Sequence, residues 1–148
     1  MTILVINGPN LNLLGQRNQK YYGKKTLKAI NQMLLNCAEK SKVKLLFFQS
    51  NCEGKIIDFI QKSSKRAEGI LINPGALTHY GYSLRDALLD TELPIIEVHL
   101  SSIEERENFR KIDVLSDIVI EKIFGFGEKS YLLGLEKLVD YLGKRDES

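Results

Sequence analysis

The sequence predicts an α/β fold built on a five-stranded parallel sheet. Five short runs of apolar and β-branched residues alternate along the chain with segments whose apolar residues recur at helical spacing. Alternation of this kind favours parallel strands that are joined by right-handed helical crossovers. For a chain of 148 residues we expect the doubly wound, flavodoxin-like strand order 2-1-3-4-5, with helices on both faces of the sheet.

The composition is typical of one soluble globular domain that covers residues 1–148. Hydrophobic residues make up 43% and charged residues 27%, and the net charge of +2 is too small to favour nucleic acid as a partner. No apolar run reaches the roughly 18 residues of a membrane span. Strand-like sequence begins at Thr2, which leaves no room for a signal peptide, and Cys37 and Cys52 fit no metal-binding spacing. We therefore expect a cytoplasmic protein with free thiols and no membrane contact.

The first half of the chain is expected to hold two strands and two helices. Residues 2–7 and 43–49 are short apolar runs that predict strands. Thr26 is the expected N-cap of a helix that runs to about Lys40, and residues 54–64 predict a second helix. Residues 8–23 separate the first strand from its helix. A connection of about 16 residues without an element of its own is usually functional, and we expect it to form a lid over the site.

The second half of the chain continues the alternation. A strand is expected at residues 69–73, a helix capped by Ser83, and a strand after Pro94. A short helix then places Arg106 and Arg110 one turn apart on the same face. The remaining expected elements are a strand within residues 117–124, an amphipathic helix at 131–142 and a frayed tail at 143–148.

Polar residues gather at the carboxyl ends of the predicted strands. Glu97, His99 and Ser101 share one face where the fourth strand leaves the sheet, although a strand buried on both faces should be nearly all apolar. Ligands of open α/β sheets bind in the crevice outside these strand ends. The set suits a small, polyhydroxylated, anionic ligand. Its other members are Asn7, Asn10, Asn12, Arg17, Tyr22, Asn73, His79, Arg106 and Arg110.

Several common kinds of site are excluded by spacing. NGPNLNLLG stands after the first strand in place of GxGxxG, so a dinucleotide site is not expected. The sequence holds neither a GxxxxGK[ST] phosphate loop nor a GxSxG nucleophile elbow. His79 and His99 lie on separate loops without an evident carboxylate cluster, which makes a poor metal site. We therefore expect no metal and no cofactor.

Acid–base catalysis remains compatible with these residues. His99 is the best titrating candidate because imidazole changes charge near neutral pH. Glu97 lies on the same strand face and could fix the His99 tautomer or only help to desolvate the site. A tyrosine, whose pKa is about 10, becomes a base only where nearby cations stabilise its phenolate. Arg17 lies five residues before Tyr22 and could supply such a cation.

A non-catalytic binding module for a flavin or a phosphorylated partner is a second possibility for the same fold. A flavodoxin-like flavin site needs a hydroxyl- and glycine-rich loop after the first strand. Proline, asparagines and leucines occupy that loop here.

The sequence resembles the type II 3-dehydroquinate dehydratases from the first strand to about Tyr131. No single motif suffices, but together they are specific. They are ILVINGPNLNLLGQR (3–17), YG (22–23), FFQSN-EG (47–54), INPGALTH (72–79), RDAL (85–88), EVHLSS (97–102), RENFR (106–110) and GFG (125–127).

The resemblance implies a cofactor-independent lyase of the shikimate pathway, and hence of aromatic amino acid biosynthesis. Such enzymes dehydrate 3-dehydroquinate to 3-dehydroshikimate by anti elimination through an enolate. It implies Tyr22 as the base, His99 as the acid, Arg17 as the lid arginine and Asn10 as holder of a water at the enolate. It implies substrate-binding or supporting roles for Asn73, His79, Leu100, Ser101, Arg110, Glu97 and Arg106. Asp86 matches a residue that reaches a neighbouring subunit, because the family assembles trimers into a dodecamer.

The sequence also departs from the family pattern. Asn18-Gln19 follows Arg17 where Glu-Pro is common, Cys52 stands where histidine is frequent, and Ser102 stands where asparagine is usual. Residues 111–123 depart from the usual pattern of that segment, and Ser130 replaces a common glycine. None of these changes removes a residue of the chemistry. A catalytically degenerate relative that binds the ligand without turnover is therefore the third possibility.

Overall fold

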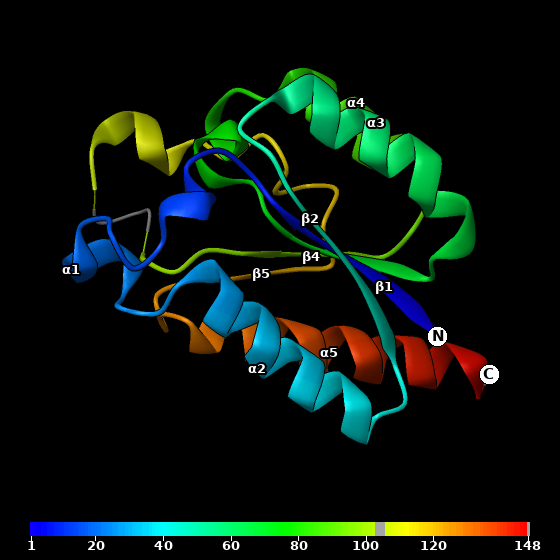
Figure 1. Ribbon diagram of the computed structural model, residues 1–148. Helices are drawn as coiled ribbons and strands as arrows, with labels where there is room; N and C mark the ends of the chain where they lie inside the picture. Colours follow the sequence, from blue (N-terminus) through cyan, green and yellow to red (C-terminus); the bar gives the residue numbers. More distant parts are fainter. Residues whose placement is uncertain (103–105, 148) are drawn as a thin grey trace.

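The computed structural model describes residues 1–102 and 106–147 as one parallel sheet between two layers of helices (Figure 1). The strand order is β2-β1-β3-β4-β5, which confirms the predicted order 2-1-3-4-5. All four neighbouring pairs are parallel. The strands are β1 (Thr2–Asn7), β2 (Lys44–Gln49), β3 (Gly69–Asn73), β4 (Ile95–Val98) and β5 (Glu121–Ile123).

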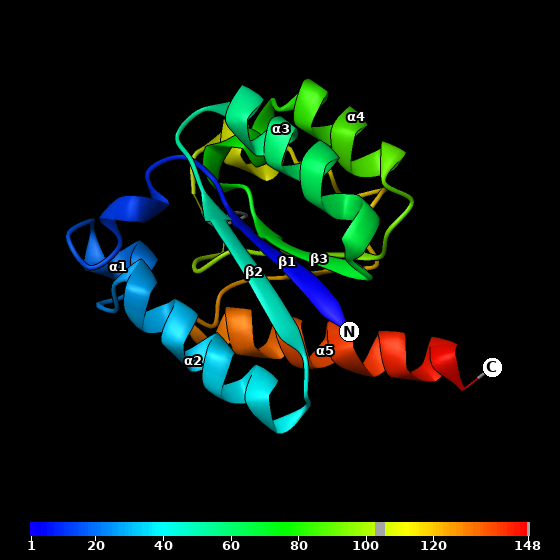
Figure 2. The same ribbon diagram turned by 45° about the vertical axis from the view of Figure 1, so that its right-hand side comes forward.

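The helices divide between the two faces of the sheet, as the two views show (Figures 1 and 2). Helices α2 (Leu27–Lys40) and α5 (Lys129–Asp146) cover one face, and α3 (Glu53–Ser63) and α4 (Tyr82–Asp90) cover the other. Within the described residues, no helix is both long and apolar enough to cross a membrane. The short elements are α1 (Gln19–Tyr22) and the 3-10 turns η1 (Leu11–Leu13), η2 (Ser64–Arg66), η3 (Gly75–His79) and η5 (Asn108–Lys111).

Alternation of side chains along β1 explains the two hydrophobic cores. Ile3 and Val5 face the core beneath α2 and α5, whereas Leu4 and Ile6 face the core beneath α3 and α4. All four side chains are buried, which is the pattern of a parallel sheet covered on both faces. The polar residues that follow the strands therefore have one place to gather, at the carboxyl edge of the sheet.

Most of the predicted boundaries agree with the structure to within a few residues. The Thr26 hydroxyl accepts a hydrogen bond from the Ala29 amide at 3.1 Å, which confirms the predicted N-cap. Helix α5 begins two residues before Tyr131 and runs to Asp146, so most of the segment expected to fray is helical.

Three expectations were wrong. Ser83 does not cap α4, because the helix begins at Tyr82 with Gly81 as its N-cap. A Cβ at position 81 would lie 2.7 Å from the Leu77 carbonyl oxygen, so this close backbone approach requires glycine. Residues 8–23 are not without elements, since they contain η1 and α1.

The third concerns the expected helix with Arg106 and Arg110 on one face. The only helical turn among residues 106–111 is η5, which starts after Arg106. Residues 103–105, where that helix was expected to start, lie outside the described part of the chain. The two arginines are therefore brought together by the fold of the segment and not by helical periodicity.

Close packing of α5 on the sheet generates a prediction. A Cβ at Gly134 would lie 2.7 Å from Val98 Cγ1 and 2.8 Å from Leu71 Cδ1, whereas a Cβ at Gly143 in the same helix has nothing within 4 Å. Gly134→Ala is expected to lower the free energy of unfolding by about 1–3 kcal/mol because it overpacks the core. Gly143→Ala is expected to raise it by about 0.5–1 kcal/mol through helix propensity. Urea unfolding measures both, and equal effects would contradict the packing account.

Candidate active site

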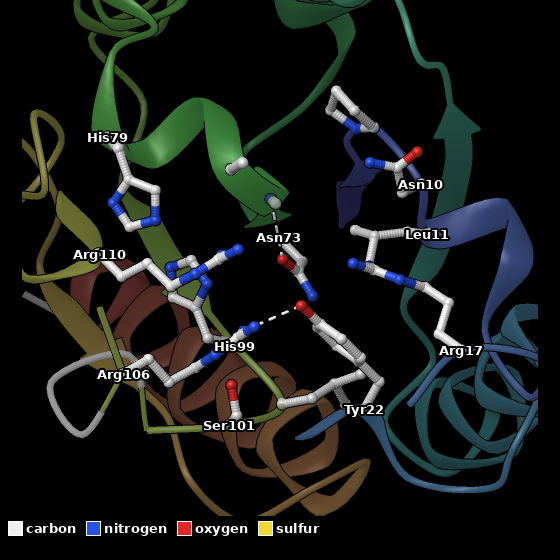
Figure 3. Close-up of a pocket in the computed structure, with 14 residues that line it drawn as sticks. Asn10, Leu11, Arg17, Tyr22, Asn73, His79, His99, Ser101, Arg106 and Arg110 are labelled. Atoms are coloured by element: carbon white, nitrogen blue, oxygen red, sulfur yellow. Dashed lines mark hydrogen bonds between the residues drawn. The ribbon is translucent and has the colours of Figure 1, made fainter. Parts of the chain in front are cut away.

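A cavity of about 110 Å³ lies at the carboxyl ends of β1, β3 and β4 (Figure 3). Ten of the twelve residues that the sequence singled out for the site line it. They come from four separate segments of the chain and are Asn10, Arg17, Tyr22, Asn73, His79, His99, Leu100, Ser101, Arg106 and Arg110. The sequence did not single out Pro9, Leu11, Gly75 and Ala76, which complete the wall.

The other two predicted site residues lie outside the cavity. Glu97 is fully buried behind His99, and Asp86 is exposed on α4. Asn12 is exposed and does not line the wall either, although it follows the same strand end. The predicted contact of Asp86 with a neighbouring subunit stays a prediction.

Tyr22 lies between two arginines (Figure 3). Arg106 Nη1 donates a hydrogen bond to the Tyr22 hydroxyl at 2.9 Å, and the Arg17 guanidinium carbon is 3.7 Å from the centroid of the ring. Arg106 also stacks over Tyr21, with its guanidinium carbon 4.1 Å from that ring centroid. These contacts place two positive charges against Tyr22. The sequence had singled out Arg17 alone as the cation near Tyr22, and the hydrogen bond to the hydroxyl comes from Arg106.

His99 is held by a buried carboxyl group. Its Nε2 lies 2.5 Å from Glu97 Oε2, so the two neighbours on the strand face do form a hydrogen bond. This contact leaves Nδ1 as the ring nitrogen for a ligand. Burial raises the pKa of the Glu97 carboxyl, the hydrogen bond from His99 opposes the shift, and the neighbouring Asp113 adds to it.

His79 is set up as a neutral hydrogen-bond acceptor. Its Nδ1 lies 2.6 Å from the Ile112 carbonyl oxygen, so Nδ1 carries the proton and donates. Burial lowers the pKa of His79, the bond to Ile112 opposes this, and the Arg110 guanidinium adds to the lowering. The free Nε2 can therefore accept a hydrogen bond from a ligand hydroxyl.

Asn73 is fixed by a buried tyrosine whose role the sequence did not reveal. The Tyr131 hydroxyl donates to Asn7 Oδ1 at 2.6 Å and accepts from Asn73 Nδ2 at 2.8 Å. Asn73 Oδ1 accepts from the Gly75 amide at 3.1 Å. Burial strongly raises the pKa of Tyr131, so this hydroxyl keeps its proton. The only sequence signal was a hydroxyl on the buried face of an amphipathic helix.

A second surprise is an acidic group beside His99. Glu97, His99 and Asp113 place one ligand-capable atom each within 4.8 Å of one another. The expectation that the histidines have no carboxylate cluster nearby was therefore wrong. The Nε2–Oε2 spacing of 2.5 Å is that of a hydrogen bond, and the Lys122 ammonium already stands 3.3 Å from Asp113 Oδ2. These spacings fit a shared proton better than a metal ion.

The arginines give the cavity its preference for anions. Arg110 and Arg106 lie in its wall beside Ser101, and Arg110 Nε also contacts Glu107 Oε2 at 2.5 Å. A guanidinium and a hydroxyl at one end of a cavity suit a carboxylate. Among the described residues of the wall there is no lysine.

Comparison with known proteins identifies the family. The family model described as dehydroquinase class II matches residues 1–139. The chain belongs to this family. The 3-dehydroquinate dehydratase of Carboxydothermus hydrogenoformans is 51% identical over 146 residues, which cover 99% of this chain and 95% of the relative. The 3-dehydroquinate dehydratase of Prochlorococcus marinus strain MIT 9301 is also 51% identical over 146 residues, covering 99% of both chains.

A solved structure supports the same assignment of this class II dehydroquinase. The type II dehydroquinase of Butyrivibrio crossotus superposes with a TM-score of 0.90 at 43% identity and covers 93% of this chain and 97% of its own. The flavodoxin-like sheet predicted from the sequence is therefore that of the family.

The buried tyrosine of this class II dehydroquinase generates a second prediction. Tyr131→Phe leaves the amides of Asn7 and Asn73 without their partner, and it is expected to lower the free energy of unfolding by about 1–3 kcal/mol. Tyr141→Phe, an exposed position of the same helix, is the matched control with an expected change within about 0.5 kcal/mol. Urea unfolding separates the two, and two equally mild changes would show that the buried hydroxyl contributes little.

Proposed function

We propose that the protein is a 3-dehydroquinate dehydratase of the shikimate pathway, which acts in the cytoplasm without a cofactor. It removes water from 3-dehydroquinate to give 3-dehydroshikimate by anti elimination through an enolate. Relatives with 51% identity carry the name 3-dehydroquinate dehydratase. The observation that carries the proposal is a single cavity that holds Tyr22 beside two arginines and His99 beside a buried carboxyl.

Tyr22 is the proposed base. Its hydroxyl accepts from Arg106, Arg17 lies over its ring, and in the proposed reaction the phenol oxygen removes the proton from C2 of the substrate. Arg17 also stabilises the transition state. The negative charge that develops on the carbonyl oxygen forms an enolate, and Asn10 is proposed to hold a water molecule against it. Preorganised donors of this kind each contribute about 3–4 kcal/mol to transition-state stabilisation.

His99 is the proposed acid. When the enolate collapses, the C1–oxygen bond breaks and the leaving hydroxyl takes a proton from the imidazole, so that water departs. Glu97 holds the ring through the 2.5 Å contact to Nε2. The cycle then leaves one proton on Tyr22 and a deficit of one on His99, which exchange with solvent restores. Both groups act in the same turnover, as elimination with acid and base requires.

The polar residues of the cavity wall are proposed to bind the carboxylate and the ring hydroxyls of the substrate. Arg110, Ser101 and the backbone of Leu100 suit its carboxylate. The neutral His79 offers an acceptor to a ring hydroxyl, and Asn73 offers its fixed amide. The main role proposed for Arg106 is to hold Tyr22, because it already donates a hydrogen bond to the phenol oxygen; contact with the substrate is its secondary role.

Assembly of trimers into a dodecamer is part of the proposal. Asp86 then reaches the site of a neighbouring subunit. Asp86 is exposed on α4, and Tyr82 and Leu89 of the same helix are 65% and 51% exposed. Arg85 forms an ion pair with Asp117 in the same subunit. An exposed apolar surface around a carboxylate is consistent with an interface at this helix.

The proposed activity is tested directly. Protein added to 3-dehydroquinate is expected to produce the ultraviolet absorbance of a conjugated enone. Treatment with substrate and borohydride before the assay is expected to leave the rate unchanged, because no lysine lines the described wall to form a Schiff base. A folded protein that binds the substrate without producing the absorbance would support the degenerate relative in its place.

The choice of base between two adjacent tyrosines gives the next prediction. Tyr22→Phe is expected to lower kcat by about 10²–10⁴-fold because the proton acceptor is lost. Tyr21→Phe is the matched control, since its ring can still stack under Arg106, and its kcat is expected to stay within a few-fold of the wild type. The enone assay measures both, and circular dichroism checks that both fold. A nearly normal rate in Tyr22→Phe would sink the assignment.

A further inference from the structure

A series of hydrogen bonds that ends in an ion pair runs from His99 away from the cavity to β5 at the edge of the sheet. Glu97 Oε2, which contacts His99, also lies 2.7 Å from the Thr78 hydroxyl. The same hydroxyl lies 2.8 Å from Asp113 Oδ1, and Asp113 Oδ2 lies 3.3 Å from Lys122 Nζ. The side chain of Asp113 is 2% exposed and that of Lys122 is 21% exposed. None of Thr78, Asp113 and Lys122 lines the cavity, so the mechanism above does not use them.

The contacts between Thr78 and the two carboxyl groups require one more proton than is present when both Glu97 and Asp113 are ionised. The Thr78 hydroxyl has one proton but lies within hydrogen-bond distance of an oxygen from each carboxyl. If it donates to Asp113, its oxygen can accept a proton that resides on Glu97. With both carboxyl groups ionised, one of the two contacts would bring two oxygens together without a proton. The spacing therefore requires one carboxyl to be protonated.

The surroundings decide which carboxyl carries the proton. Burial raises the pKa of Asp113, but hydrogen bonds from Glu97, Thr78 and the Leu115 amide, together with Lys122, outweigh it and lower the pKa. The pKa of Glu97 is raised, mainly by burial, and its interactions with His99 oppose the rise without cancelling it. Asp113 is thus the ionised partner and Glu97 the protonated one.

Other charged groups face this series of hydrogen bonds from the elements packed around it. His79 at the end of η3 interacts with both His99 and Asp113, and Arg110 of η5 lies next to His79. Lys122 of β5 contacts the Asp113 carboxyl group directly. The positive charges of Arg110 and Lys122 oppose protonation of the His99–Glu97 pair, whereas the carboxylate of Asp113 favours it.

We propose that Asp113 is a positioning residue for the acid: through Thr78 it keeps a proton on the His99–Glu97 pair, and Lys122 limits how strongly it does so. The inference rests on the proposed function for the role of His99 as acid. Its charge coupling can be measured without turnover. The negative charge of Asp113 raises the pH up to which the His99–Glu97 pair keeps its proton, and the positive charge of Lys122 reduces that effect.

Nuclear magnetic resonance provides the first test, because the chain has only two histidines and His79→Asn assigns their signals. We expect the titration midpoint of the His99–Glu97 pair to move to lower pH by about one unit in Asp113→Asn. We expect it to move to higher pH in Lys122→Gln. Lys137→Gln, which removes the lysine of the exposed Glu121 pair, is the matched control and should leave the midpoint in place.

Opposite shifts are the signature of charge coupling, since a merely structural role would give losses without opposite displacements. Asn at position 113 can still accept the Leu115 amide, so the loop retains this bond. Should Asp113→Asn fail to fold, Lys122→Gln alone decides, because a midpoint equal to that of Lys137→Gln overturns the proposal.

The pH dependence of kcat with 3-dehydroquinate provides the second test. The alkaline limb, where the acid loses its proton, is expected to move in the same directions as the midpoints. KM is expected to change less than kcat, because neither residue lines the cavity. Turnover with coincident limbs in all variants overturns the inference and leaves the function standing. Displaced midpoints without any turnover support the coupling and reject the dehydratase.

Discussion

The buried hydroxyl of Tyr131 joins the ends of the two central strands beneath the cavity. Asn7 ends β1 and Asn73 ends β3, and each is almost completely buried, so neither amide can rely on water for its hydrogen bonds. Tyr131 partners both from α5 on one face of the sheet. The site therefore depends on a contact that links the two central strands to a helix far along the chain, and Asn73 reaches the cavity in one orientation.

The fold was largely predictable because its signals are local. Buried apolar runs, turn residues and helical spacing lie next to one another in the sequence, and a parallel sheet of this size has few compatible strand orders. The errors came from contacts that are distant in sequence or in backbone geometry. Ser83 has a good capping side chain, yet the helix begins earlier because the backbone at Gly81 packs tightly against Leu77. Capping propensity gave way to tertiary packing.

The site was predictable for a different reason. Once strand order is assumed, polar residues after the strands must converge on one edge, and the resemblance to the family adds their roles. Asp113 and Tyr131 were not predicted because neither lines the cavity. Asp113 contacts Thr78, and Tyr131 contacts the two buried asparagines. No pattern in one sequence shows that Asp113 comes to lie near Glu97, since the two are joined through Thr78, which also accepts a backbone hydrogen bond from Val114.

The two sides of the cavity differ in the groups that surround them. Tyr22 faces guanidinium groups on its ring and hydroxyl. His99 is backed by the carboxyl groups of Glu97 and, beyond it, Asp113. The elimination proposed above needs a base and an acid at the same pH, and a separation of cations from carboxyl groups suits it. The arginines beside Tyr22 and the carboxyl groups behind His99 therefore form one electrostatic arrangement, with cations at one side of the cavity and acidic groups at the other.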